Sequence, residues 1–132
     1  MTKSRKNLYK KRNDRKYLEG RLYVNLEAFL AQNPNALKTE MDTVYNDVSN
    51  GPFMQTFRFD KIQLLFGLYH DKKNGETMLN GINKIDDDIL GHSLFNKYFE
   101  VLVTDRGSEF TFAEKCEFRD DKTSQANLFY CD

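Results

Sequence analysis

The sequence predicts a single α/β domain built on one mixed β-sheet, and three observations predict this class. Three apolar segments, at residues 38–46, 53–59 and 62–70, are separated by short turn sequences. A helical pattern at residues 78–89 follows them, and a further apolar segment comes after it at residues 100–104. Three antiparallel strands, a helical crossover and a parallel strand give a mixed sheet. The length of 132 residues corresponds to one domain.

The beginning of the chain is expected to hold a basic arm and a short helix. Residues 1–16 contain eight basic residues and one acid, whereas residues 17–132 contain 12 basic and 19 acidic residues. This asymmetry favours a basic arm for a polyanion, joined to an acidic domain. A basic tail without a specific partner explains the same charges equally well. Residues 24–31 form the helix candidate, and Pro34 prevents that helix from continuing.

The middle of the chain predicts a buried strand followed by a helix. Residues 62–70 are apolar at nearly every position, as expected for a central strand that is buried on both faces. Apolar residues then recur at helical spacing from Met78 to Ile89, and Gly91 can end this helix in the left-handed conformation.

The last part of the chain predicts strands and short connections. A turn around residues 94–99 leads into a strand at residues 100–104. Residues 115–119 and 127–131 are the last two strand candidates.

Composition argues against several classes of protein. Cys116 and Cys131 have no CxxC spacing and no histidine nearby, so a zinc site is not expected and the thiols should be reduced. No apolar stretch approaches the length of a membrane span, and no apolar segment of a signal peptide follows the basic N-terminus. We therefore expect a cytoplasmic protein that does not enter a membrane.

Two aspartates suggest a divalent-metal site. Asp105 ends the predicted strand at residues 100–104 and lies two residues before Gly107, which allows a close backbone approach. Asp42 lies inside the first predicted strand. Carboxylates suit Mg²⁺ or Mn²⁺, and paired metal ions can promote cleavage of phosphodiester bonds. The alternative interpretation is that Asp105 is a turn residue without a function.

Several motifs resemble one family when they are taken together. They are Lys16-Tyr17-Leu18-Glu19-Gly20-Arg21, Glu40-Met41-Asp42-Thr43-Val44, Thr104-Asp105-Arg106-Gly107-Ser108-Glu109-Phe110 and Phe129-Tyr130-Cys131-Asp132. Their order and spacing resemble those of the bacterial insertion-sequence transposases of the family numbered thirty, which carry an integrase-type catalytic core. The resemblance covers residues 15–132.

The resemblance implies a ribonuclease H-like fold and three catalytic acids, Asp, Asp and Glu, which hold magnesium ions. By motif match, Asp42 is the first acid and Asp105 the second. The third is expected on a helix beyond Asp132, so the domain is predicted to be incomplete and to lack its C-terminal helices. Two consequences are expected, namely little strand cleavage by this chain and an exposed apolar sheet face that favours self-association.

The resemblance also implies DNA as the partner, both as transposon ends and as target. A homo-oligomer, or association with a full-length transposase, is expected. Contacts to DNA phosphates are assigned to the basic arm. The residues assigned to them are Lys10, Lys11, Arg12, Arg15 and Lys16.

The remaining acids are expected to have minor roles. Within the motif, Gly107 supplies the turn that presents Asp105, and Glu109 is expected to support the site rather than to bind metal. Residues 86–88 are three aspartates that fan out around a helix, which predicts a solvated face. The same is expected of a charged hairpin that contains Glu117, Asp120 and Asp121.

Two other classes of function remain open at this stage. The chain could be a non-catalytic DNA-binding or interaction remnant that interferes with a full-length transposase. It could also be a small metal-dependent nuclease, which requires a third acid from within the chain. Glu109, Glu117 and Asp132 are the candidates for that acid.

Overall fold

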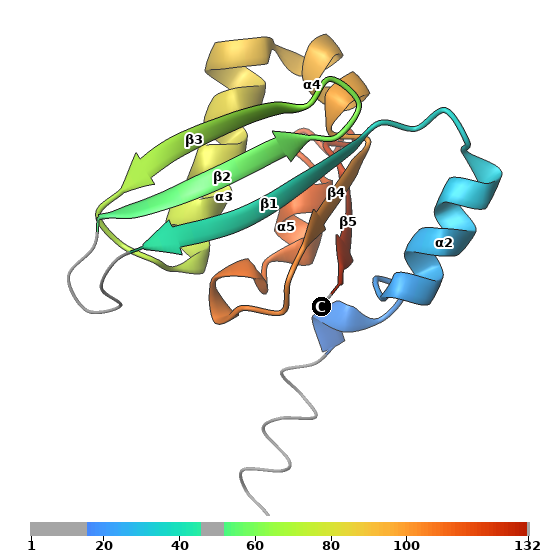
Figure 1. Cartoon of the computed structure of the whole chain (residues 1–132), viewed down its shortest axis with the longest axis horizontal. Coiled ribbons are helices and arrows are strands. Elements are labelled where there is room, and N and C mark those ends of the chain that lie inside the picture. The colour runs from blue at the N-terminus through green and yellow to red at the C-terminus, as the bar shows by residue number, and fades with distance from the viewer. Residues whose placement is uncertain (1–15, 46–51, 132) are drawn as a thin grey trace, which may run out of the picture.

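A computed structural model describes residues 16–45 and 52–131, and its centre is a five-stranded mixed sheet (Figure 1). The strand order is β3-β2-β1-β4-β5. β1 pairs antiparallel with β2, β2 pairs antiparallel with β3, and β4 and β5 run parallel to β1. The strands are β1 (Lys38–Tyr45), β2 (Phe53–Phe59), β3 (Leu64–His70), β4 (Val101–Thr104) and β5 (Asn127–Tyr130). This topology confirms the predicted α/β class and the mixed sheet expected of a ribonuclease H-like core.

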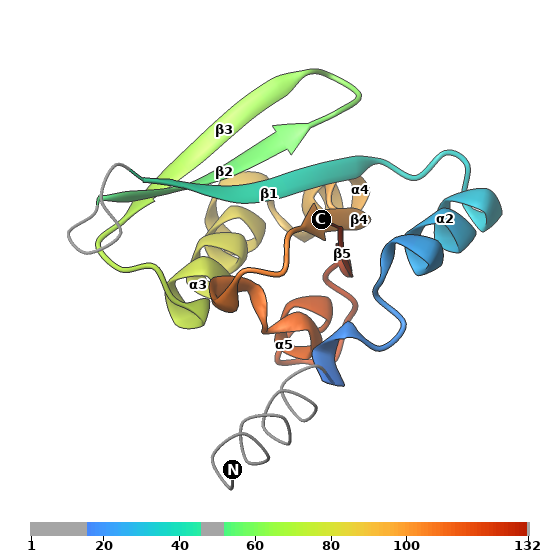
Figure 2. The same ribbon diagram turned by 60° about the horizontal axis from the view of Figure 1, so that its bottom comes forward.

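Helices cover the two faces of the sheet unequally. The inner face packs on the main core, to which four helical segments contribute buried side chains, besides Leu18 and Phe110 from two 3-10 helices. Those segments are α3 (Gly75–Lys84), the π-helix η2 (Ile85–Leu90), α4 (His92–Tyr98) and α5 (Ala113–Glu117). The outer face is covered at β4 and β5 by α2 (Tyr23–Gln32), where Leu26 packs on Val101, Val103 and Phe129 (Figure 2).

The alternation of β1 separates core residues from candidate site residues. Met41 is 2% exposed and lies in the main core, whereas Asp42 is exposed on the outer face. Successive side chains of a strand point to opposite faces, so burial of Met41 directs Asp42 outward. Thr39 is buried as well, and its hydroxyl donates a hydrogen bond of 2.8 Å to the Tyr98 carbonyl.

The prediction that residues 62–70 form a buried central strand is wrong. Residues 62 and 63 belong to the hairpin turn, where Gln63 has a φ of 52°. β3 is the edge strand of the sheet, and Leu65 and Tyr69 are 66% and 76% exposed. A uniformly apolar strand is buried only if another element covers it, and no helix within residues 16–45 and 52–131 covers the outer face at this edge.

Other elements agree with the sequence or differ from it in type. The helix at residues 24–31 lies within α2, and Gly91 has the expected positive φ of 82°. The predicted strand at residues 115–119 is instead α5, a short helix that buries Ala113 and Cys116. The predicted turn around residues 94–99 is mostly the helix α4, which directs Phe95 into the core.

Two further expectations concern the membrane and the arm. No helix in the described part of the chain is long and apolar enough to cross a bilayer. Of the basic arm, residues 1–15 lie outside the described residues, and Lys16 begins the 3-10 helix η1 (Lys16–Leu18). The predicted contacts of Lys10, Lys11, Arg12 and Arg15 therefore remain predictions.

Candidate metal site at the strand ends

Asp42 and Asp105 line one open cavity of about 440 Å³ on the outer face of the sheet. β1 and β4 are neighbouring parallel strands, and Glu40 lies in register with Val103. Asp42 and Asp105 each follow this pair by two residues, so they come together where β4 ends beside the middle of β1. The structure thus brings together the two acids that the motifs selected, and Cys131, just after β5, lines the same cavity.

The turn after β4 fixes the Asp105 carboxylate. Its Oδ1 accepts a hydrogen bond of 2.7 Å from the backbone N–H of Gly107. A Cβ atom on Gly107 would lie 2.3 Å from Glu109 Oε1 and 2.9 Å from Asp105 Oδ1. A side chain at this position would therefore require the Glu109 and Asp105 carboxylates to shift.

Glu109 is buried beneath this turn and does not line the cavity of Asp42 and Asp105. Its Oε2 lies 3.4 Å from Lys73 Nζ, and that ammonium lies 4.4 Å from the centre of the Tyr45 ring. Burial alone would lower the pKa of Lys73, but the attraction of Glu109 and Tyr45 outweighs it and raises that pKa. Lys73 thus links the end of β1 to the turn that carries Asp105.

Sequence reasoning missed Glu40, which lines the same cavity as the two aspartates. It precedes Asp42 by two residues on β1, so both side chains share the outer face, and this spacing could have identified it. Glu40 forms an ion pair with Arg58 on β2, directly opposite in the strand register. Its carboxylate is therefore already engaged by a cation.

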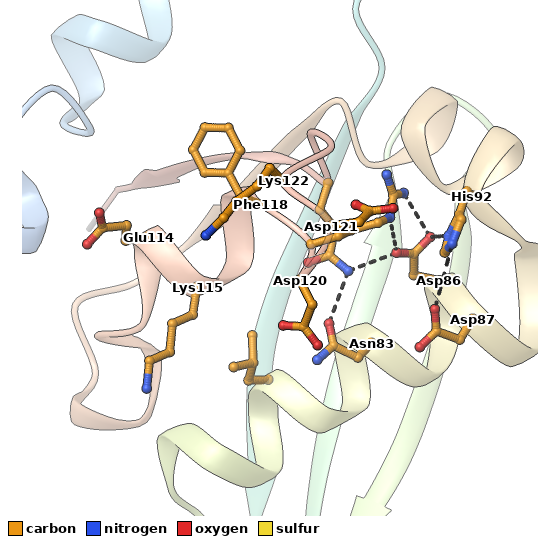
Figure 3. A pocket seen from close by; sticks show the side chains of 13 residues that line it. Asn83, Asp86, Asp87, His92, Glu114, Lys115, Phe118, Asp120, Asp121 and Lys122 are labelled. Atoms are coloured by element: carbon orange, nitrogen blue, oxygen red, sulfur yellow. Dashed lines mark hydrogen bonds and ion pairs between the residues drawn. The ribbon is translucent and has the colours of Figure 1, made fainter.

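A different group of ligand atoms is the only set of three in the described residues that lies within 4.8 Å. It consists of Asp86, Asp87 and His92, beside a second cavity (Figure 3). The prediction that residues 86–88 are a solvated helix face is wrong for Asp86, which is 1% exposed. Asp86 lies in the π-helix and points toward α5 and the segment that follows it, away from bulk solvent.

Both oxygens of Asp86 already accept hydrogen bonds. Arg119 donates from Nε over 2.6 Å and from Nη2 over 2.9 Å, His92 Nδ1 lies 2.7 Å away, and Gln125 Nε2 donates over 2.9 Å. Burial alone would raise the pKa of Asp86, but the bonds from Arg119, His92 and Gln125 leave that pKa below its usual value. With a guanidinium on the carboxylate, this group is a structural ion pair and not a cation site.

The charged segment near the C-terminus is only partly solvated, which corrects another expectation. Glu117 accepts a hydrogen bond of 2.6 Å from Arg21 Nη2 and another of 3.3 Å from the backbone N–H of Leu128. It therefore ties α5 to the start of the domain and to β5. Asp120 and Asp121 are exposed, as predicted.

Comparisons with known proteins find similarity among solved structures. No family model matches the chain, and no curated protein aligns with it. Among solved structures, the HTLV-2 integrase catalytic core domain, solved in complex with magnesium in a dimeric form, superimposes with a TM-score of 0.48 at 13% identity. The match covers 71% of this chain and 60% of that one.

Proposed function

We propose that this chain is catalytic-core sequence of an insertion-sequence transposase, in which Asp42 and Asp105 bind the divalent metal used for DNA strand cleavage and strand transfer. The observation that carries the proposal is the convergence of these two acids. They come from motifs 63 positions apart and line one cavity on two neighbouring parallel strands, Asp42 within β1 and Asp105 just after β4.

The donor chemistry of the cavity fits a hard cation. Asp42 and Asp105 are both exposed, so their carboxylate oxygens are accessible to an ion. Mg²⁺ and Mn²⁺ prefer carboxylate oxygen, and an ion held there would polarise a phosphodiester group. Gly107 holds one of these carboxylates through its N–H, and Glu109 supports the turn from beneath.

The described residues supply only two available acids at this cavity. Glu40 is paired with Arg58, and Glu109 is paired with Lys73 on the inner side of the turn. We therefore propose that the chain binds a metal ion weakly and cleaves DNA poorly by itself. This shortage also favours the second candidate function, a non-catalytic remnant that binds a full-length transposase.

Metal binding tests the proposal directly. Titration with Mn²⁺, followed by electron paramagnetic resonance, should show one site that Mg²⁺ competes for. Asp42→Asn and Asp105→Asn should each weaken it by at least about tenfold. Asp87→Asn, which removes an exposed carboxylate elsewhere, is the matched control and should leave the affinity unchanged.

Cleavage of transposon-end DNA separates the two candidate functions. Mn²⁺ affinity that is unchanged by Asp42→Asn and Asp105→Asn would refute the proposed metal site. Robust cleavage abolished by Asp105→Ala would show that the chain supplies a complete site. Inhibition of an intact transposase by the Asp42→Asn, Asp105→Asn double variant would support the remnant, since that variant cannot act through metal.

A further inference from the structure

We propose that β3 joins two copies of this chain edge to edge, in an antiparallel pair that makes one continuous sheet. The partner is a second copy of the same chain. This inference rests on the backbone edge of β3 and not on metal binding, although Leu65 also lines the cavity of Asp42 and Asp105.

The outer edge of β3 is open and unprotected. β2 is the only strand that pairs with it in the described residues, so alternate backbone N–H and C=O groups along the other edge have no strand partner. Natural edge strands are usually blocked by charge, proline or a covering element. Leu64–His70 contains no Lys, Arg, Asp, Glu or Pro, and in the view of Figure 2 none of the helices that the structure describes lies beyond this edge.

The side chains of β3 match those of a second β3. Two identical strands can pair around a two-fold axis only if they are antiparallel. The inner faces of the two sheets then lie on the same side of the combined sheet. With Phe66 on the axis, Leu65 of each copy lies opposite Gly67 of the other and diagonally beside Tyr69. Leu65 and Tyr69 are among the most exposed apolar side chains, and this pairing covers both.

The charges at the two ends of β3 are complementary. Lys61 lies in the hairpin turn before the strand, and Asp71 follows it directly. Antiparallel pairing brings Lys61 of one copy toward Asp71 of the other. The two-fold axis repeats this contact at the other end of the strand pair. Within one chain these residues lie at opposite ends of a strand about 20 Å long, so they cannot pair with each other.

The chemistry of this edge favours a strand over the other classes of partner. A nucleic acid needs cations, which β3 lacks, and main-chain groups in a row are best satisfied by another strand. A single strand pair buries less than the roughly 1,600 Å² of a typical stable interface. The dimer should therefore be weak and depend on concentration.

Sedimentation of the 132-residue chain over about a hundredfold range of concentration tests the proposal. We expect a reversible monomer–dimer equilibrium, and Leu65→Lys should weaken it by at least about tenfold, because a charge blocks the edge. The matched control is Leu94→Lys, which changes a 47% exposed leucine that belongs to α4 and not to β3, and it should leave dimerisation unchanged. Circular dichroism verifies that both variants fold.

A charge exchange identifies the interface itself. Lys61→Glu and Asp71→Lys should each weaken dimerisation, and the double variant should restore it, since only contacts between copies can pair these positions. A monomer at all concentrations, an equal effect of Leu94→Lys, or failure of the double variant to restore the dimer would overturn the proposal.

Discussion

Asp86 shows how far the surroundings of one residue can depart from its local sequence. Three consecutive aspartates suggest solvent, yet the first of them is buried against Arg119, which lies 33 residues later. Buried ion pairs contribute little net stability, but removal of one partner is costly because the other charge stays buried. The side chain of Arg119 is only 9% exposed, so this cost applies here.

We predict that Asp86→Asn lowers the free energy of unfolding by about 3 kcal/mol, whereas Asp87→Asn changes it little. Because the folded protein holds the pKa of Asp86 below its ordinary 3.8, this contribution is present above that pH. It is lost as the pH falls through 3.8 and then through the lower folded-state pKa. Urea unfolding of both variants at several pH values measures the effect, and equal stabilities would contradict the prediction.

At the scale of elements, the turn after β4 leaves little room for a side chain at Gly107. Gly107 has an ordinary φ of −59°, so its conformation does not require glycine. Instead, Glu109 Oε1 and Asp105 Oδ1 occupy the space that a Cβ would need. A side chain at residue 107 would therefore change the positions of both carboxylates.

We predict that Gly107→Ala weakens Mn²⁺ binding by about tenfold, because the added Cβ would push the Asp105 carboxylate away from its position. Gly75→Ala is the control, since a Cβ there would make ordinary contacts of 3.7 Å with Phe112. The same titration that tests Asp42 and Asp105 measures both variants. An unchanged affinity in Gly107→Ala would show that the turn tolerates a side chain.

At the scale of the whole molecule, the reactivity of the two thiols measures whether the main core stays packed. Cys116 is fully buried, and burial raises the pKa of its thiol to about 12, whereas Cys131 is partly exposed. An un-ionised, buried thiol reacts very slowly with disulfide reagents. The reactivity of Cys116 should therefore follow opening of the main core.

We predict that a chromogenic aromatic disulfide labels one thiol rapidly in the native protein at neutral pH and both thiols in urea. Cys116→Ser should remove only the slow reaction, and Cys131→Ser should remove the fast one. Rapid labelling of both thiols in native protein would mean that α5 does not stay packed on the sheet.

The sequence itself predicts much of this protein. Periodicity and turns place all five strands within a few residues, and the mixed sheet follows from their order. The motif match, together with the place of Asp42 inside a predicted strand and of Asp105 at a strand end, selects the two acids that line one cavity. These features are local, or they follow from the direction of neighbouring strands. The pattern of residues along the sequence is therefore sufficient to predict them.

Only the tertiary structure decided which surfaces are covered and which charges are paired. β3 has the composition of a central strand, but its place in the sheet leaves it at the edge. Glu40 and Asp86 each acquire a cation from a distant segment, and this removes them from the acids available to a metal ion. Burial and ion pairing depend on contacts between residues far apart in the chain, which spacing along the sequence does not encode.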